Sequence, residues 1–141
     1  RHWKSDYAAG KMILADRYTT SNALYQMVKL PRAQWDSYLA WLQDFEYHKI
    51  GIPAPDLVVY LDMPVEISQR LLSNRYAGDE QKKDMHEGNI RYLQACREAA
   101  LYACEALHFC RIDCAPAGKP MEEREVARQI FACVEKEMLS C

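Results

Sequence analysis

Asp56-Leu57-Val58-Val59-Tyr60-Leu61-Asp62 is the stretch that decides the fold class of this 141-residue chain. Five consecutive apolar or aromatic residues stand between two acids, a pattern that predicts a strand buried on both faces of a parallel sheet. Two further strands are expected, over Lys11 to Ala15 and over His108 to Cys114. Polar residues alternate in the last of these, so it should lie near a sheet edge.

Helical patterns alternate with the strands along the chain. Six helices are expected, over Trp3 to Ala9, Ser21 to Lys29, Gln34 to Ile50, Val65 to Asn74, Asp84 to Leu107 and Glu122 to Leu139. Strands that alternate with helices pair in parallel through crossover connections. The length suits one domain, so residues 1–141 are predicted to form a single α/β domain.

The helix expected over 34–50 carries an apolar face with helical spacing. Its members are Trp35, Tyr38, Leu39, Leu42 and Phe45. Trp41 and Tyr47 lie off this face, which makes them candidates for a second surface, such as a subunit interface.

Composition excludes several classes of function. Half of the residues are hydrophobic and the net charge is −2, which gives no general attraction to nucleic acid or to an anionic membrane. No apolar run reaches the roughly 20 residues needed to span a bilayer. The first residues are polar and do not resemble a signal peptide, so we expect a cytoplasmic protein.

The chain has six cysteines: Cys96, Cys104, Cys110, Cys114, Cys133 and Cys141. The chain is too long and too helical for a small disulfide scaffold. The Cys110-x3-Cys114 spacing is not a usual zinc pair. We therefore expect reduced cysteines that are mostly buried and bind no metal.

Asp16-Arg17-Tyr18 follows the first expected strand and precedes a helix. In open α/β sheets, ligands bind at the carboxyl ends of the strands, so an acid and a base at this place are candidate site residues. The alternative is a surface ion pair, which would contribute little to stability. The triplet alone favours neither interpretation.

Four stretches are similar to motifs of one enzyme family, in the same order and spacing. They are Asp16-Arg17-Tyr18 with Ser21-Asn22 and Tyr25-Gln26, then Pro53 to Asp62, then Pro64-Val65-Glu66 with Arg70 and Arg75, and finally Ile112-Asp113 before a small-residue loop and a helix. The chain resembles the thymidylate kinases, P-loop nucleoside monophosphate kinases that transfer a phosphoryl group from ATP to dTMP. The resemblance implies a P-loop kinase-like parallel sheet flanked by helices.

On the acceptor side, the resemblance implies a role for each residue of the first stretch. Asp16 would help to order Mg²⁺ through water, and Arg17 would bind the dTMP phosphate. A planar guanidinium suits that task because it holds two oxygens at once. Asn22 would meet the thymine edge, and Tyr25 would pack on the deoxyribose. The implied substrate-binding residues are Arg17, Tyr18, Ser21, Asn22, Tyr25 and Gln26.

On the ATP side, the resemblance implies a lid over about 75–84 and a loop along the adenine pocket. Arg75, Lys82 and Lys83 would be catalytic lid residues, and Arg75 would also contact ATP. Ala115 and Pro116 would line the adenine pocket. From spacing alone, the lid residues fit a solvated loop better than a site, and local pattern favours Asn22 as a helix-start residue. Tyr25 could equally be a core aromatic.

The P-loop motif G-x-x-x-x-G-K-[ST] does not occur in these 141 residues. We therefore expect the chain to be the C-terminal part of a thymidylate kinase-like domain, with three strands present and the first strands and the P-loop missing. ATP, Mg²⁺ and dTMP are the implied ligands, and a homodimer without nucleic acid or membrane partners is the implied assembly. The chain alone should show little or no ATP-dependent activity.

Two other functions remain open at this point. A related kinase could act on another deoxynucleoside or nucleotide acceptor. A degenerate relative could bind nucleotides without catalysis, although the intact Asp16-Arg17 pair, Tyr25 and Arg75 argue against decay. A glycine-rich loop ending in Gly-Lys-Ser or Gly-Lys-Thr before Arg1 would favour the enzyme.

Overall fold

The computed structural model describes residues 3–75 and 83–139, and the side chains of 74–88 lie outside that description. The α-helices are α1 (Trp3–Ala8), α2 (Ser21–Tyr25), α3 (Trp35–Gln43), α4 (Val65–Arg75), α5 (Lys83–Ala106) and α6 (Glu123–Met138). The strands are β1 (Val59–Asp62) and β2 (Cys110–Asp113). Short 3₁₀ turns are η1 (Met27–Lys29), η2 (Arg32–Gln34) and η5 (Pro116–Gly118), and η3 (Asp44–Lys49) is a π-helix. Among these helices, none is long and apolar enough to cross a bilayer.

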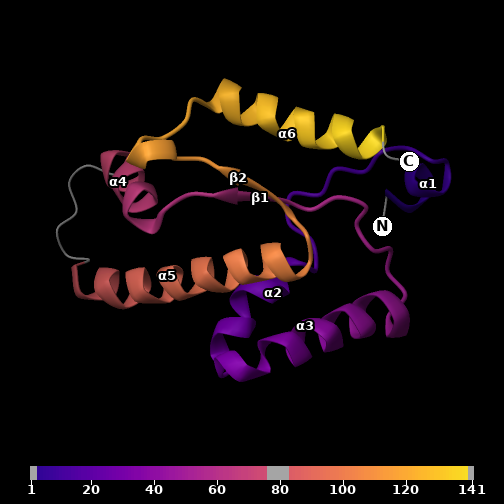
Figure 1. Ribbon diagram of the computed structural model, residues 1–141, viewed down its shortest axis with the longest axis horizontal. Helices are drawn as coiled ribbons and strands as arrows, with labels where there is room; N and C mark the ends of the chain where they lie inside the picture. Colours follow the sequence, from indigo (N-terminus) through magenta and orange to yellow (C-terminus); the bar gives the residue numbers. More distant parts are fainter. Residues whose placement is uncertain (1–2, 76–82, 140–141) are drawn as a thin grey trace.

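The two strands pair in parallel, with Val59 opposite Cys110 and Asp62 opposite Asp113. Parallel pairing and the helical connection between the strands confirm an α/β arrangement. In Figure 1, α6 covers one face of this sheet, while α5 and then α2 and α3 lie on the other side. The carboxyl ends of β1 and β2 lead to α4 and to η5, respectively.

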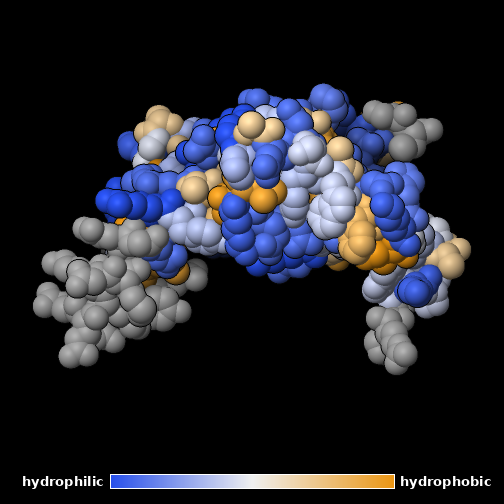
Figure 2. Space-filling model, turned by 90° about the horizontal axis from the view of Figure 1, so that it is seen from below, coloured by the Kyte–Doolittle hydropathy of each residue, from blue (hydrophilic) through white to orange (hydrophobic). Residues whose placement is uncertain are grey.

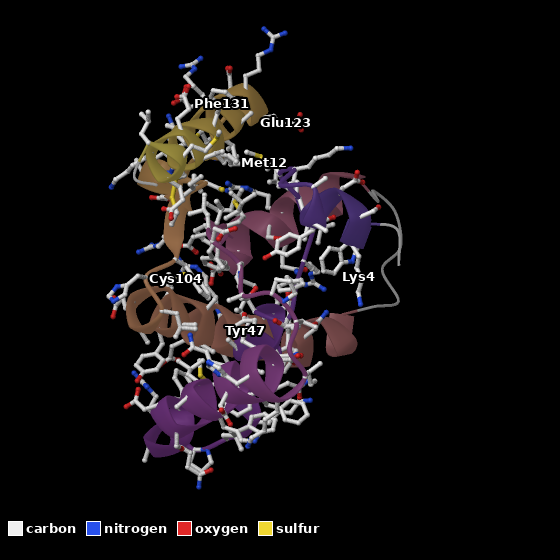
Figure 3. All side chains as sticks on the ribbon, turned by 90° about the vertical axis from the view of Figure 1, so that its right-hand side faces the viewer. Lys4, Met12, Tyr47, Cys104, Glu123 and Phe131 are labelled. Atoms are coloured by element: carbon white, nitrogen blue, oxygen red, sulfur yellow. A yellow bond between two sulfur atoms is a disulfide. The ribbon has the colours of Figure 1, made fainter. Side chains whose placement is uncertain are left out.

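The strand expected over Lys11 to Ala15 is wrong. This segment is not assigned to a strand, although it runs beside α6 in both Figure 1 and Figure 3, where Met12 is labelled. A strand needs a hydrogen-bonding neighbour, and among the described residues the only paired strands are β1 and β2. Leu14 is 90% exposed, so the apolar run lies on the surface instead of inside a sheet.

The main core lies between α2, α3 and α5. Its buried members are Ala23, Met27, Trp35, Leu39, Leu42, Ala99 and Ala103. The small residues Ala99 and Ala103 on α5 allow α2 to approach closely, and a Met fills the irregular space beside them. This packing fixes α2, which begins at Ser21, three residues after Tyr18.

The helix expected over 34–50 changes its geometry halfway along. The α-helical part ends at Gln43 and continues as the π-helix η3 until Gly51, whose φ of +74° is the left-handed conformation that ends helices. The predicted apolar face holds for Trp35, Leu39 and Leu42. It is wrong for Phe45, which is 37% exposed and stacks on Trp41 at 5.2 Å between ring centroids.

α3 and α5 also form part of the outer surface. Trp41 is 50% exposed, as its position off the apolar face predicts. Figure 2 views the molecule from this side, where hydrophilic residues cover most of the surface around smaller hydrophobic areas. Tyr47 on η3 is half-buried, and its hydroxyl lies 3.4 Å from Oγ1 of Thr19 (Figure 3).

α6 packs less tightly than α5. Among its described residues none is fully buried, and Phe131 lies on its outer side, 63% exposed (Figure 3). An apolar cavity of about 660 Å³ separates α6 from α4, with Leu61 and Leu72 in its wall. The acids Glu123 and Glu125 in its first turn complement the helix dipole.

The cysteines divide into two groups. Cys96, Cys104 and Cys114 are free and buried, as predicted. Cys110 on β2 and Cys133 on α6 form a disulfide, so the prediction that all cysteines are reduced is wrong for this pair. Sequence spacing did not indicate the pairing, because the two residues meet only when α6 lies against β2. Cys141 lies outside the described residues.

Native Cys104 is expected to resist alkylation. Burial raises the pKa of its thiol to about 11, with Asp62 and Glu105 adding to the rise and Arg111 opposing it. A thiol pKa of about 11, instead of the ordinary value of about 9, lowers the thiolate fraction at mildly alkaline pH by about 100-fold. Mass spectrometry after timed iodoacetamide treatment should find Cys104 modified only in urea. Rapid labelling of Cys104 in the native protein would contradict this prediction.

Candidate functional site

Arg17 is the most unusual residue of the Asp16-Arg17-Tyr18 loop. Its φ is +71°, a left-handed conformation that costs an arginine about 1 kcal/mol or more and clusters at functional sites. Its Nη2 donates to the Tyr25 hydroxyl at 2.5 Å, and its Cζ lies 4.9 Å from the centre of the Tyr25 ring. The structure therefore brings together two residues predicted for the site, and it does so on an exposed surface.

Tyr18 connects this loop to the segment before β1. Its hydroxyl donates to the carbonyl oxygen of Pro53 at 2.9 Å. Burial raises the pKa of Tyr18, and the nearby Tyr47, Glu46 and Tyr7 raise it further. The phenol is thus a neutral anchor of the loop, and its contact runs to Pro53 instead of to open solvent.

Asn22 faces the π-helix η3. Its Nδ2 donates to Oε1 of Glu46 at 3.5 Å, and its backbone oxygen accepts from the Tyr38 hydroxyl at 3.3 Å. Thr19 approaches the same helix, with its Oγ1 3.4 Å from the hydroxyl of Tyr47. Polar groups from Thr19 to Asn22 therefore meet groups of α3 and η3 that lie 16 to 28 residues further along the chain.

The remaining predicted residues of the acceptor side lie nearby but point elsewhere. Ser21 begins α2, and its backbone nitrogen donates to the backbone carbonyl oxygen of Tyr18 at 3.0 Å. Thr20 stands before the helix without a side-chain capping bond. Gln26 is exposed and accepts from Lys29 at 2.8 Å. α5 also contacts this segment, since the Tyr92 hydroxyl lies 3.5 Å from the Tyr25 carbonyl oxygen.

The predicted ATP-side residues are only partly described. Arg75 ends α4 and Lys83 begins α5, but their side chains lie outside the described residues, as does Lys82 with most of the expected lid. Ala115 is buried after β2, and its nitrogen donates to Oδ1 of Asp113 at 2.9 Å. Pro116 opens η5, where Ala117 has a φ of +53°. These contacts hold the loop against β2.

Sequence reasoning missed a charged cluster at the carboxyl end of β1. Asp62 is fully buried and accepts from Arg97 Nε at 2.6 Å and from Arg111 Nη2 at 2.6 Å. Burial alone would raise the pKa of Asp62, but the hydrogen bonds from Arg97 and Arg111 outweigh it and lower the pKa. An acid at the end of a buried strand was a visible signal. Its partners, 35 and 49 residues away, were not.

Asp16 supplies the one carboxylate that was predicted to meet a magnesium ion. Asp16 is exposed in the loop before Arg17, and within the described part of the chain no group of three His, Cys, Asp or Glu side chains could hold a metal. Mg²⁺ usually keeps several waters and uses one or two carboxylates together with substrate phosphates. The exposed Asp16 carboxylate fits that pattern of indirect binding.

Comparison with known proteins gives a consistent result. A family model described as thymidylate kinase matches residues 1–129. A thymidylate kinase of Mycobacterium tuberculosis is 30% identical over 93 residues, which cover 65% of this chain and 42% of the relative. A "Probable thymidylate kinase" of Thermococcus gammatolerans is 31% identical over 132 residues, covering 94% and 55%. One of Methanosarcina mazei is 28% identical over 137 residues, covering 94% and 61%.

The matches differ in how much of each relative they include. This chain spans about half the length of the curated relatives that it matches, from 42% to 61% for these three. No solved structure matches the chain significantly.

Proposed function

Because this chain belongs to the thymidylate kinase family, we propose that it serves phosphoryl transfer from ATP to dTMP, giving dTDP for dTTP synthesis. The P-loop motif does not occur in these 141 residues. The proposal therefore gives this chain, as the C-terminal part of a P-loop kinase-like domain, the acceptor side of the reaction and the lid over about 75–84.

The observation that carries the proposal is the arrangement of Arg17 and Tyr25. Arg17 is held in a left-handed conformation and hydrogen-bonded to Tyr25 at 2.5 Å. An exposed guanidinium aimed by a neighbouring ring supports a role in binding the acceptor phosphate, because it can offer two parallel donors to phosphate oxygens. Transfer through a loose transition state then needs positioning and positive charge more than covalent chemistry.

Tyr25 and Asn22 complete the acceptor side in this proposal. The Tyr25 ring would pack on the deoxyribose, where a 2′-hydroxyl would collide with it. Asn22 would meet the thymine edge. Tyr18, Ser21 and Gln26 would complete the wall around the nucleotide, with Tyr18 fixed to Pro53.

ATP and Mg²⁺ are part of the proposal. Asp16 would hold the ion through water, and the ion would neutralise charge on the transferred group when bound. Arg75, Lys82 and Lys83 would bring positive charge from the lid, and Ala115 with Pro116 would border the adenine. A closed lid would exclude water and so limit hydrolysis of ATP.

The proposed setting is a cytoplasmic homodimer that acts on small molecules without nucleic acid or membrane partners. The stacked and exposed Trp41 and Phe45 support the dimer, since aromatic residues are enriched at protein–protein interfaces. In a reducing cytoplasm the Cys110–Cys133 disulfide would be subject to reduction.

Calorimetric titration of the chain with dTMP and with ribothymidine monophosphate tests this function. We expect dTMP to bind about 10- to 100-fold more tightly, because the Tyr25 ring leaves no room for the extra hydroxyl. Tyr25→Phe should keep this preference and Tyr25→Ala should lose it. Failure to bind dTMP, or preference for the ribonucleotide, would overturn the proposal. A coupled assay that detects dTMP-dependent ADP formation by the chain alone would refute its expected inactivity.

A further inference from the structure

We propose that Glu46 is a positioning residue that fixes the side-chain amide of Asn22, so that the site selects a pyrimidine base with an imide N–H. The inference rests on the proposed function, because it assumes that Asn22 meets the base of the acceptor. It adds the residue that decides which chemical group the base must present.

The contact between the two side chains sets the direction of the amide. Asn22 Nδ2 lies 3.5 Å from Glu46 Oε1. A carboxylate only accepts hydrogen bonds, whereas an amide has one donating and one accepting end. The amide must therefore turn its nitrogen toward Glu46, which turns its oxygen away.

Glu46 is itself held in place by the π-helix. The backbone oxygen of Glu46 accepts a hydrogen bond from the nitrogen of Ile52 at 3.2 Å, just after η3 ends. π-helical turns are rare and frequently mark functional sites. The hydroxyl of the neighbouring Tyr47 lies 3.4 Å from Oγ1 of Thr19, in the segment before α2 (Figure 3).

The negative charge of Glu46 acts on the groups around Asn22. Burial is the main cause of the raised pKa values of Tyr18 and Tyr38, and the negative charge of Glu46 raises both further. The Tyr38 hydroxyl also donates to the backbone oxygen of Asn22 at 3.3 Å. Backbone and amide of Asn22 are thus both fixed from the α3–η3 side.

The oxygen of the Asn22 amide remains open to solvent. In the described part of the chain, no donor forms a hydrogen bond with Asn22 Oδ1, while every buried side-chain nitrogen or oxygen there has a partner. Asn22 is only half-buried, so its unpartnered oxygen must be one that solvent can reach. An accessible, oriented acceptor is available to a ligand.

An oriented acceptor discriminates between pyrimidines by their hydrogen-bonding edge. Thymine and uracil carry an N–H at ring position 3, which can donate to Asn22 Oδ1. Cytosine has a lone pair at that nitrogen, which would face the amide oxygen and repel it. Because Glu46 prevents the amide from turning over, the site cannot adapt to cytosine.

Binding measurements on three proteins test this inference: the wild-type chain, Glu46→Gln and Asp44→Asn. The glutamine can donate as well as accept, so it permits the Asn22 amide to turn over. Asp44 is the matched control, since it lies on the same π-helix and pairs with Lys49 at 2.9 Å. Calorimetry gives the ratio of Kd values for dCMP and dTMP, and dUMP should behave like dTMP.

We expect the wild-type chain to favour dTMP over dCMP by about 100-fold or more, since an unpaired polar edge is rejected strongly. Glu46→Gln should reduce this ratio by about 10-fold or more, whereas Asp44→Asn should keep it within about twofold. In the ligand-free protein, the side-chain NH₂ resonance of Asn22 should shift in Glu46→Gln but not in Asp44→Asn. A structural role alone would change stability and leave the ratio intact.

The outcomes separate this inference from the proposed function. Tight dTMP binding with an unchanged ratio in Glu46→Gln would overturn the role of Glu46 and leave the proposed function standing. If the side-chain NH₂ resonance of Asn22 does not shift in Glu46→Gln, the role of Glu46 is overturned without the use of any ligand. A wild-type chain that binds none of the nucleotides would overturn both.

Discussion

Replacing Arg17 with alanine is expected to weaken dTMP binding by roughly 10- to 100-fold, since hydrogen bonds to charged groups contribute about 1.5–3 kcal/mol. In a kinase that contains this chain, turnover should fall on the order of 10³-fold, the scale for losing an arginine that stabilises phosphoryl transfer. Both effects follow from the proposed contact with the acceptor phosphate.

The fold should survive this substitution. The Arg17 side chain is exposed and its described contacts run to Tyr25. Alanine would occupy the same left-handed conformation at a similar cost, so the urea unfolding midpoint should hardly change. A loss of binding can then be assigned to the missing guanidinium.

Two companion variants sharpen the measurement. Arg17→Lys keeps the charge but loses the planar pair of donors, so it should recover only part of the affinity. Arg124→Ala removes an exposed arginine of α6 and should leave affinity and turnover unchanged. Near-normal turnover in Arg17→Ala would show that Arg17 makes only a surface contact with Tyr25.

Local pattern was sufficient for those elements whose partners lie close in sequence or whose apolar run is continuous. β1 (Val59–Asp62) lies within the predicted stretch from Asp56 to Asp62, and α4 begins at Val65 as predicted after Pro64. Burial of β1 on both faces was wrong for Leu61, which is 46% exposed. Arg17 and Tyr25 belong to one motif and are only eight residues apart, and they lie in contact in the structure.

Other features depend on the whole fold. Lys11 to Ala15 has strand composition, but pairing requires a neighbour that its own residues do not specify. The change to π-helix at Asp44 rotates the following side chains, which brings Glu46 toward Asn22 and leaves Phe45 exposed. The Cys110–Cys133 bond and the Asp62 cluster likewise join residues that only packing brings together.

Asp62→Ala is expected to destabilise the chain by about 2–3 kcal/mol, below the range of about 3–5 kcal/mol for breaking a buried ion pair, because the arginines that remain are partly exposed. The Asp62 side chain is 0% exposed, while Arg97 and Arg111 are 32% and 48% exposed. The more exposed Arg111 can recover hydration when Asp62 is lost, so most of the cost should come from Arg97 and from the cavity.

Urea unfolding monitored by tryptophan fluorescence measures this loss. Glu125→Ala is the control, because Glu125 pairs with Arg128 at 2.6 Å on the exposed side of α6, and such pairs contribute roughly 0–1 kcal/mol. Equal small effects in both variants would contradict a structural role for Asp62. Arg97→Ala should cost more than Arg111→Ala if the difference in exposure decides the effect.

The pH dependence gives an independent check on Asp62. Hydrogen bonds from Arg97 and Arg111 outweigh the effect of burial and lower the pKa of Asp62 in the folded chain. A lowered folded pKa means that the contribution is complete above the unfolded pKa of about 3.9 and is lost as pH falls toward the folded value. Wild type should therefore lose stability more steeply below about pH 4 than Asp62→Asn, which cannot titrate there. Glu66, whose pKa is also lowered, is common to both proteins, so the difference between their curves isolates Asp62. Parallel curves would mean that the buried carboxylate gains nothing from its two arginines.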